Sequence, residues 1–304
     1  MRHVLGIDAG GTSTCALLAT EDGGVVASAS AGPANLRING ELEVEKALHA
    51  AAETAISEGG ARPDAVALGI AGAGRPEDED VLRALLRRIG FRDRVVVTND
   101  AHIAFVAGSP RRVGLALVCG TGSMAWGRNA GGRVARAGGW GWRLGDEGSG
   151  FWIGERAIRA ALRAEDGRGP ATALAGAVRS HFGFERPDQI VYAVYDGGYP
   201  RHKIALFAAA VEREALAGDA AARRVLTDAE EELTLCAQSV ISRLGLSAAD
   251  YDVVLSGGTF HALRSLEQAV AKRLAAPRAR VQELAGEAAQ GAVALAIDAL
   301  RSGG

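Results

Sequence analysis

A glycine-rich segment in the middle of the chain combines aromatic and acidic side chains. It covers residues 138–150, Gly-Gly-Trp-Gly-Trp-Arg-Leu-Gly-Asp-Glu-Gly-Ser-Gly, and six of its thirteen residues are glycine. Glycine loses more conformational entropy on folding than other residues, so such a stretch needs a compensating reason, and a bound ligand is a common one. Trp140 and Trp142 offer flat apolar surfaces, whereas Asp146 and Glu147 offer acceptors for hydroxyl groups. The combination indicates a sugar site.

Each of these side chains also has an ordinary structural interpretation. Either tryptophan could be a core aromatic, and this is the preferred interpretation for Trp142. Glu147 could pair with Arg143 on a solvated face. Asp146 is therefore the preferred sugar-binding carboxylate.

Four apolar runs of the chain end in turns of small residues. Backbone N–H groups converge on a phosphate most easily where glycine leaves room, and Thr or Ser hydroxyls add uncharged donors. One such turn alone is more often a plain hairpin, but the set predicts a nucleotide site. The turns cover residues 10–14, 69–74, 120–123 and 256–259.

Asp8 stands at the end of the first apolar run, directly before the first turn. An Asp before glycines is commonly just a turn residue. The hydroxyl run Thr12-Ser13-Thr14 that follows favours a role with metal and phosphate instead.

Other common chemistries lack their signatures. The sequence contains no G-x-x-x-x-G-K-[ST] loop, no G-x-G-x-x-G fingerprint and no G-x-S-x-G elbow. Its six histidines show no H-x-x-x-H spacing, and no C-x-x-C pair occurs. Zinc, nicotinamide and serine-nucleophile chemistry are therefore not indicated.

Length and composition predict a cytoplasmic protein of two lobes. The 304 residues exceed one compact core, and 48% are hydrophobic. A net charge of −2 points to neither nucleic acid nor an anionic membrane as partner. Cys15, Cys119 and Cys236 are odd in number and far apart, as in reduced cytosolic proteins. The apolar run Val4–Ile7 leaves no room for a signal peptide, and no run is long enough to span a membrane.

Short apolar runs alternate with helical patterns, which predicts an α/β fold. The expected strands are His3–Asp8, Thr14–Thr20, Val25–Ala31, Ala65–Gly69, Arg94–Thr98, Gly114–Cys119, Met124–Asn129 and Asp252–Ser256. The expected helices are Glu41–Glu58, Glu77–Ile89, Ala101–Gly108, Ser149–Ala164, Ala171–Phe182, Lys203–Leu216, Ala220–Leu244, His261–Leu274 and Glu287–Arg301. The plan of residues 5–14, an apolar strand entering glycines and hydroxyls, returns in residues 115–123. Duplicated lobes would explain this echo, although chance could also produce it.

Taken in order, these motifs resemble one known family. The resemblance rests on Asp8-x-Gly-Gly-Thr, Gly69-x-Ala-Gly-x-Gly, Thr98-Asn-Asp, Gly120-Thr-Gly-Ser, the block 138–150 and Ser256-Gly-Gly. The chain is similar over its whole length to the N-acetylglucosamine kinase group, often classed with the BadF/BadG/BcrA/BcrD ATPases. That group belongs to the sugar kinase/Hsp70/actin superfamily.

The resemblance implies two ribonuclease H-like lobes of the actin/hexokinase type, with nucleotide and sugar in the cleft between them. The N-terminal lobe would cover residues 1–112 and be completed by the final helix, 287–304. The C-terminal lobe would cover residues 113–286. Gly72, Gly74 and Gly291 are candidates for hinge positions, or else they permit close helix packing.

The resemblance also implies roles for individual residues. Asp8 would hold Mg²⁺ through water, and Asp100 would be the catalytic base, unless Asn99 or Asp100 only caps the next helix. ATP would be bound by Gly10, Gly11, Thr12, Ser13, Thr14, Thr121, Gly122, Gly257, Gly258 and His261. The sugar would be bound by Asn35, Asp100, Ser123, Met124, Gly139, Trp140, Gly141 and Asp146.

The implied activity is ATP-dependent phosphorylation of an amino sugar at O6, in a homodimer that uses Mg²⁺. Met124 stands where some members carry an Asn that touches the sugar. The hexosamine therefore stays open among N-acetylglucosamine, glucosamine and N-acetylmuramic acid. A different class, an ATPase that activates a redox partner, would need cluster-binding cysteines, and none of the three lies in such a motif. A non-catalytic sugar sensor of the same fold is a third possibility, disfavoured by the intact Asp8 and Asp100.

Overall fold

The protein is described by a computed structural model that covers residues 1–195 and 201–302. It divides into two compact units. Unit 1 comprises residues 1–116, residues 126–134 and the chain from Gln282 onward, and unit 2 comprises residues 117–125 and 135–281. The lobe boundaries expected from the sequence stay a prediction, and the two units are described separately below.

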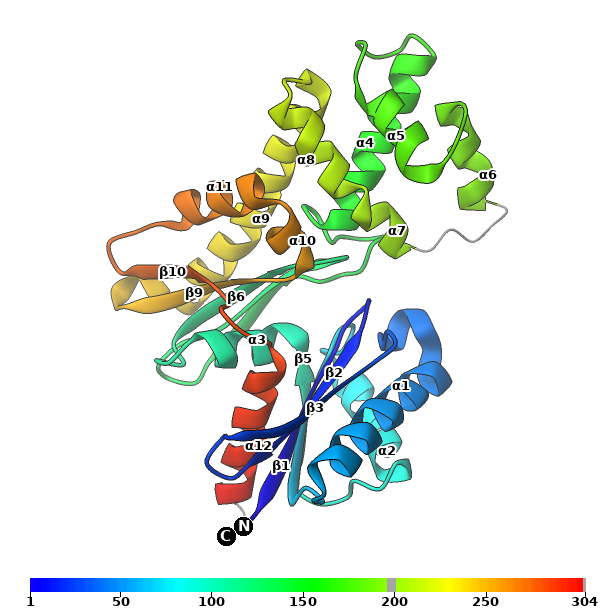
Figure 1. Cartoon of the computed structure of the whole chain (residues 1–304). Coiled ribbons are helices and arrows are strands. Elements are labelled where there is room, and N and C mark those ends of the chain that lie inside the picture. The colour runs from blue at the N-terminus through cyan, green and yellow to red at the C-terminus, as the bar shows by residue number, and fades with distance from the viewer. Residues whose placement is uncertain (196–200, 303–304) are drawn as a thin grey trace. The chain divides into compact units, whose positions relative to one another are not determined.

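Unit 1 contains a mixed five-stranded sheet with the order β3-β2-β1-β4-β5 (Figure 1). β1 pairs antiparallel with β2 and β2 with β3, whereas β4 and β5 run parallel to β1. The apolar residues of β1 and β4 are buried on both faces of the sheet, as expected for central strands. The strands are β1 His3–Ala9, β2 Thr14–Thr20, β3 Val25–Ala31, β4 Ala65–Ile70 and β5 Val95–Asn99.

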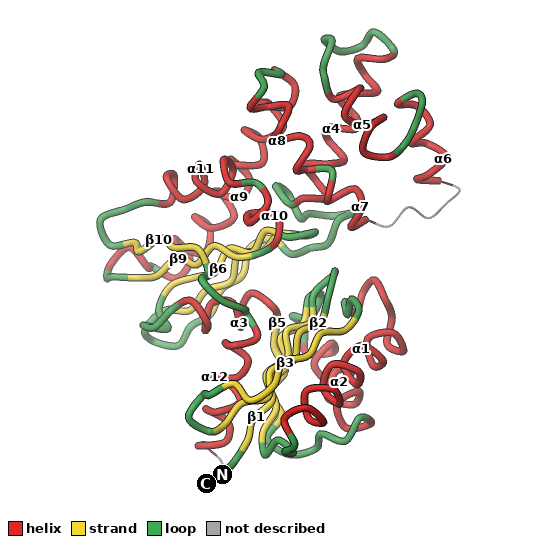
Figure 2. The backbone as a smooth tube through the Cα atoms, viewed as in Figure 1, coloured by secondary structure: helices red, strands yellow, loops and turns green. Residues whose placement is uncertain are grey.

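Helices cover both faces of this sheet (Figure 2). One core, which includes Leu5 and Leu48, lies between the sheet and the helices α1 and α2. The other core, which includes Val4 and Ile103, lies between the sheet and the helices α3 and α12. The four helices are α1 Leu36–Gly59, α2 Pro76–Arg88, α3 Asp100–Gly108 and α12 Ala289–Ser302.

The last helix packs unusually closely in unit 1. A Cβ atom at Gly6 of β1 would collide with the backbone of α12 at Val293. A Cβ atom at Gly291 of α12 would collide with the carbonyl oxygen of Ile103 in α3. Gly291 therefore permits close packing of α12 against α3, one of the two roles considered for it from the sequence.

The second sheet, most of whose residues belong to unit 2, repeats the strand order of the first sheet. Its order is β10-β9-β6-β7-β8. When β6 to β10 are matched in turn with β1 to β5, the two orders are the same, so the sequence echo at residues 5–14 and 115–123 marks two equivalent hairpins. The strands are β6 Gly114–Cys119, β7 Ser123–Arg128, β8 Val134–Gly138, β9 Tyr251–Ser256 and β10 Ala279–Glu283. β8 and β10 were not expected, because these edge strands carry too little buried apolar surface to give a pattern.

The helices of unit 2 include α9, which has the bounds expected from the sequence. The expected helix His261–Leu274 is divided at Leu263, which leaves helical geometry (φ −110°, ψ 79°) and buries its side chain. The expected helix Lys203–Leu216 is also divided, into α7 and α8. The α-helices are α4 Gly150–Glu165, α5 Leu174–Phe182, α6 Ile190–Tyr195, α7 Arg201–Leu206, α8 Ala208–Leu216, α9 Ala220–Leu244, α10 Gly258–Ala262 and α11 Arg264–Leu274. Short 3₁₀ turns lie at η1 Pro187–Gln189 and η2 Leu246–Ala248.

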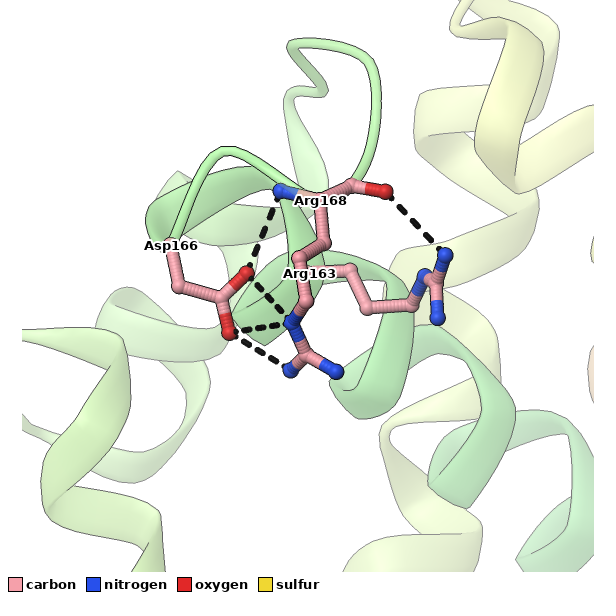
Figure 3. A network of polar contacts seen from close by, with 3 residues as sticks. All are labelled: Arg163, Asp166 and Arg168. Carbon is pink, nitrogen blue, oxygen red and sulfur yellow. Dashed lines mark hydrogen bonds and ion pairs between the residues drawn. The ribbon is translucent and has the colours of Figure 1, made fainter.

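The C-terminal end of α4 is held by a local polar network (Figure 3). The side chain of Arg168 donates from Nε to both carboxylate oxygens of Asp166 at 2.9 Å. Arg163 donates in turn to the carbonyl oxygen of Arg168 at 3.1 Å. The contacts join neighbours in sequence and are exposed, so they order the end of the helix and do not form a site.

Within residues 1–195 and 201–302, no helix combines the length and the apolar character that crossing a membrane requires.

Because α12 packs so closely, the effect of a glycine-to-alanine substitution on stability should depend on its position. Gly291→Ala should lower the free energy of unfolding by about 1–3 kcal/mol, because the new Cβ must displace α3 or α12. Gly176→Ala is the matched control: it also lies within a helix, but the nearest atom to its Cβ, in the side chain of Arg179 on the same helix, would be 3.9 Å away. Alanine there should be neutral or stabilising by up to about 1 kcal/mol. Thermal and urea unfolding of both variants would measure this, and equal stabilities would contradict the packing argument.

Candidate active site

Two carboxylates lie at the same edge of the unit 1 sheet, where parallel strands end. Asp8 of β1 pairs with Gly69 of β4, and Gly69 pairs with Thr98 of β5. Asp100 follows two residues after Thr98, as the first residue of α3. Position 69 requires glycine for a structural reason, because a Cβ there would collide with Ile103 of α3. The missing side chain lets α3 approach the sheet, and the start of this helix lies at the strand edge where ligands commonly bind in α/β folds.

Burial raises the pKa of both carboxyl groups, and repulsion by nearby acids adds to the shift of Asp8. The pKa of Asp8 is raised to about 7, first by burial and then by the charges of Asp100 and Glu287. Burial also raises the pKa of Asp100, although the backbone N–H of Ala101 donates to its Oδ1 at 2.9 Å and opposes the shift. Both groups can therefore exchange protons nearer to neutral pH than ordinary carboxyl groups.

The capping of α3 is performed by Asn99. Its Oδ1 accepts a hydrogen bond from the backbone N–H of His102 at 2.8 Å, and its backbone is extended, as an N-cap requires. Asp100 is not the cap residue. Helix capping, the purely structural role considered for Asp100 from the sequence, is thus performed by Asn99.

Glu287 joins this cluster and was missed by the sequence analysis. It lies just before α12, and its carboxylate accepts a hydrogen bond from the Cys15 thiol, with Sγ and Oε2 3.1 Å apart. Burial and this carboxylate raise the pKa of Cys15 to about 12, so the thiol stays protonated. An acidic residue at the start of the final small-residue helix was the available signal, but nothing in the sequence linked it to Asp8.

In the first turn, between β1 and β2, the outer residues are exposed to solvent, whereas the last residue is buried and stabilises the turn. The N–H of Gly10 donates to the carbonyl of Ser13 at 2.9 Å and closes the turn. Thr12 and Ser13 are exposed, together with Gly11. Thr14 is fully buried, and its hydroxyl donates to the carbonyl of Gly32 at 2.8 Å. The hydroxyls that remain accessible to phosphate are therefore those of Thr12 and Ser13.

Asn35 is the N-cap of α1. Its Oδ1 accepts from the backbone N–H of Arg37 at 3.1 Å, and its own N–H donates to Oδ1 of Asn39 at 2.9 Å. Gly72, with a left-handed φ of 84°, lies against this amide: a Cβ would be 2.8 Å from Oδ1. Gly40 (φ 75°) then kinks α1. These contacts hold the Asn35 side chain in place.

In unit 2, the turn between β6 and β7 is joined to two other segments through one carbonyl group. The carbonyl of Gly120 accepts from the N–H of Gly150 at 2.9 Å and from the hydroxyl of Thr259 at 2.8 Å. Gly257 (φ 110°) packs on the backbone of Cys119, where any side chain would collide. Thr121 and Gly122 are half-buried beside this junction, and Gly258 and His261 on α10 are exposed.

The glycine-rich segment needs its glycines mainly for backbone conformation and close packing. Gly138, Gly139, Gly141 and Gly148 have φ values between 69° and 88°. Gly139 lies on buried Met124, and a Cβ there would be 2.8 Å from the thioether sulfur.

The neighbouring Ser123 supports the same segment. It is buried, and its hydroxyl donates to the carbonyl of Glu147 at 2.7 Å. Its own carbonyl accepts the N–H of Gly139 at 3.0 Å. Ser123 and Met124 thus lie beneath the segment and shape it.

Asp146 has a backbone conformation that is unusual for a residue with a side chain. Its φ is 58°, in the left-handed region, and residues other than glycine with such strained backbone conformations cluster at functional sites. Its Oδ1 accepts the N–H of Gly141 at 3.2 Å, and Gly122 leaves room for the carboxylate. Burial raises its pKa to about 6, while the N–H groups of Gly141 and Ser123 and the charge of Arg201 oppose the shift.

Both tryptophans of the segment reach the surface. Trp140 is 56% exposed, with the guanidinium carbon of Arg136 4.8 Å from its ring centroid. Trp142 is 40% exposed, so the prediction that it is a core aromatic is wrong. The glycine-supported backbone carries it out of the core. Arg143 lies over the Trp142 ring at 4.8 Å, and within the described residues it forms no ion pair with Glu147.

Arg201 is the second residue that sequence analysis missed. It is the first residue of α7, and its guanidinium carbon lies 5.3 Å from the Trp142 ring centroid. It belongs to no motif and stands far from Asp146 in the chain, so no sequence signal marked it.

The protein offers no metal cage of its own in the parts of the chain that the structure describes: no group of three His, Cys, Asp or Glu side chains is placed to hold an ion. Mg²⁺ is commonly bound by one or two carboxylates together with waters and substrate phosphates. A buried carboxylate at Asp8, directly before an exposed glycine and hydroxyl turn, fits that mode of binding.

Comparison with known proteins identifies the family. Residues 5–296 match the family described as BadF/BadG/BcrA/BcrD ATPases. The chain belongs to the BadF/BadG/BcrA/BcrD ATPase family. This BadF-type chain is 32% identical over 301 residues, covering 97% of its own length and 98% of the relative, to the N-acetylmuramic acid/N-acetylglucosamine kinase of Clostridium acetobutylicum. It is 26% identical to the N-acetyl-D-glucosamine kinase of Dictyostelium discoideum, covering 97% of each chain.

The fold of this BadF-type protein also matches a solved structure. A Chromobacterium violaceum protein proposed to be an N-acetylglucosamine kinase superposes with a TM-score of 0.76 at 26% identity, covering 97% of this chain and 99% of the other. Together with the two five-stranded sheets of like strand order, this confirms the predicted two-lobed sugar-kinase fold.

Asp8 should make the stability of the protein depend on pH. Its folded-state pKa of about 7 lies above the ordinary 3.8, so the folded protein binds this proton more tightly than the unfolded chain. The stability it contributes is complete below about pH 4 and is lost as the pH rises to about 7. In Mg²⁺-free buffer, Asp8→Asn should therefore be more stable than wild type at pH 8, by about 2–4 kcal/mol at about 1.36 kcal/mol per pK unit, and should gain little at pH 4.5.

Urea unfolding at the two pH values measures this difference. Asp250→Asn, at an exposed aspartate, is the matched control and should show no pH-dependent gain. A constant difference between Asp8→Asn and wild type at both pH values would contradict the assigned burial and repulsion.

Proposed function

We propose that this chain transfers the γ-phosphate of ATP to O6 of an amino sugar, either N-acetylglucosamine or glucosamine. The observation that carries the proposal is the pair Asp8 and Asp100 at one strand edge, with the pKa of each raised. Membership of an ATPase family and the kinase names of the two relatives support it. The chain is then an amino sugar kinase.

Asp100 is the proposed general base. Its carboxylate accepts the proton of the 6-hydroxyl as O6 forms a bond to the γ-phosphorus and the bond to the β–γ bridging oxygen breaks, which releases ADP. Phosphoryl transfer asks mainly for positioning and electrostatic stabilisation, so one well-placed carboxylate is sufficient as base. A pKa nearer to the operating pH makes Asp100 a stronger base than an ordinary aspartate.

Asp8 is proposed to hold Mg²⁺ through water, and the ion would neutralise charge on the β- and γ-phosphates. The phosphates would lie against Gly10, Gly11, Thr12 and Ser13 of the first turn and Thr121 and Gly122 of the second. Thr14 would act indirectly, by fixing the first turn from its buried position. Gly257, Gly258 and His261 would border the adenosine.

The proposed sugar-binding residues come from two parts of the chain. Asn35 and Asp100 belong to unit 1, and the residues of unit 2 are Trp140, Gly141 and Asp146 with Ser123, Met124 and Gly139 beneath them. Trp140 offers an exposed aromatic face, and Asp146 offers a carboxylate for sugar hydroxyls.

The direct test is ADP release in a coupled assay with single sugars. We expect turnover with N-acetylglucosamine or glucosamine that exceeds turnover with glucose and N-acetylmannosamine, and phosphorus NMR of the product should place the phosphate on C6. Absence of sugar-dependent ADP release with all these sugars would refute the proposed function. Phosphate at another position would refute the O6 assignment alone.

The role of Asp100 can be separated from helix capping with two neighbouring variants. Asp100→Asn should lower kcat by about 10²–10⁴-fold, because the base is lost, and leave the thermal unfolding temperature near that of wild type or above it. Asn99→Ala removes the actual cap and should cost about 0.5–2 kcal/mol of stability. Near-normal turnover of folded Asp100→Asn would overturn the assignment of the base.

A further inference from the structure

The opening turn of α1, residues 36–39, is separate from the rest of that helix. Gly40 follows it with non-helical backbone angles (φ 75°, ψ 164°), so the helix is kinked there. The buried residues of α1 begin only beyond the kink, at Val44, and no residue from 36 to 39 is buried. Apolar packing therefore holds the body of α1 more firmly than the opening turn, although this turn directly follows Asn35, one of the proposed sugar-binding residues.

The chain just before Asn35 is hydrogen-bonded to the turn between β1 and β2. The N–H of Ala34 donates to the carbonyl of Gly10 at 2.9 Å, and the hydroxyl of Thr14 donates to the carbonyl of Gly32 at 2.8 Å. One side of Asn35 is thus fixed to the turn that carries proposed phosphate-binding residues. The other side needs a separate attachment, because the kink interrupts the helix that would otherwise provide it.

Arg37 provides this second attachment. Its backbone N–H donates to Oδ1 of Asn35 at 3.1 Å. Its guanidinium group forms an ion pair with Asp78, which lies in the first turn of α2. Arg37 therefore contacts the Asn35 side chain through its backbone and contacts α2 through its side chain. The backbone contact fixes which side of the Asn35 amide faces α1, and thus which side is presented to a ligand.

The ion pair is unequal, because its acid is buried and its base is not. The side chain of Asp78 is 5% exposed, whereas that of Arg37 is 53% exposed. Within residues 1–195 and 201–302, no other side chain pairs with Asp78. Burial of a carboxylate costs free energy that one ion pair offsets only in part, so such a pair is weak evidence for stability. The geometry that the pair imposes on the opening turn is the better explanation for it.

A second ion pair joins the same two helices beyond the kink. Arg88 of α2 donates from Nε and Nη2 to Oε2 of Glu45 in α1, at 2.9 and 2.7 Å. The body of α1 thus has its own bridge to α2 in addition to its buried residues. The contribution of Arg37 and Asp78 is therefore concentrated on the opening turn beside Asn35.

We propose that Arg37 and Asp78 are positioning residues that hold the Asn35 amide in the orientation in which it binds the sugar. The inference rests on the proposed function, because it assigns the pair to the same sugar site. Asp78 fixes the side chain of Arg37, and the backbone of Arg37 fixes Asn35. Loss of the ion pair should then weaken sugar binding, although every residue that contacts the sugar is still present.

The test measures kcat, KM for the amino sugar and KM for ATP in wild type and in variants of the pair. Arg37→Gln and Asp78→Asn should each raise KM for the sugar by about 2- to 10-fold, the equivalent of about one hydrogen bond, and leave KM for ATP within about twofold. The double variant should be no worse than either single variant, because both remove the same interaction. Arg37→Lys, which keeps the charge, should restore most of the wild-type KM.

Arg88→Gln is the matched control, because it also breaks an arginine–carboxylate bridge between α1 and α2. It should leave KM for the sugar unchanged, even where it lowers the unfolding temperature as much as Arg37→Gln does. If Arg37→Gln does not fold because it leaves Asp78 buried and unpaired, Asp78→Asn removes the buried charge and gives the same comparison.

Amide hydrogen exchange of the ligand-free protein tests the inference without turnover. The N–H groups of Ile38 and Asn39 donate to the carbonyl of Asn35 at 3.0 and 2.9 Å, so they report on the opening turn. Their exchange should be faster in Arg37→Gln and Asp78→Asn than in wild type, and unchanged in Arg88→Gln.

Three outcomes would overturn the inference and leave the proposed function intact. Unchanged exchange in both variants would show that the ion pair does not order the opening turn. Faster exchange with an unchanged KM for the sugar would show that this order does not serve the sugar site. Effects of Arg37→Gln and Asp78→Asn that add in the double variant would show that Arg37 contacts the substrate directly. A wild type without turnover on any amino sugar would instead refute the proposed function, and the inference with it.

Discussion

The proposed site depends on two carboxylates that are kept close together at the end of a parallel sheet and partly out of water. Burial is the largest cause of the raised pKa of both Asp8 and Asp100, and the charge of Asp100 adds to the shift of Asp8. The arrangement is possible because Gly69 of β4, which lies between β1 and β5, has no side chain to hold α3 and its first residue Asp100 away. Burying the two carboxylates costs electrostatic free energy. The same burial makes both groups titrate nearer to neutral pH, where a general base and an ion-binding group are useful.

Unit 2 uses a different device, because its functional side chains are placed by backbone conformation. The left-handed glycines from Gly138 to Gly148 bring Trp140 and Trp142 to the surface and let Asp146 lie over Gly122. The buried residues Ser123 and Met124 hold this segment from beneath. The glycines are thus a condition for placing the aromatic and acidic groups.

The sequence was most informative where pattern and chemistry coincide. The central strands, α9 and the paired hairpin turns could be predicted because apolar runs and glycines mark them locally. The edge strands β8 and β10 could not, because half-exposed edges carry little apolar pattern. Glu287 and Arg201 were missed for another reason: each reaches its partner only through tertiary folding, and a lone charged residue has no spacing to reveal it. Trp142 was misjudged because aromatic character suggests burial, whereas the surrounding glycines carry it outward.

The close packing of α12 against Gly6 of β1 has a consequence for synthesis of the protein on the ribosome. β1 is synthesised long before α12, the helix that covers one face of its sheet. Until α12 has been synthesised, the apolar residues around Val4, Leu17 and Ala67 lack this cover. The sheet of unit 1 therefore exposes apolar surface until α12 is available, and such transiently exposed surface favours aggregation.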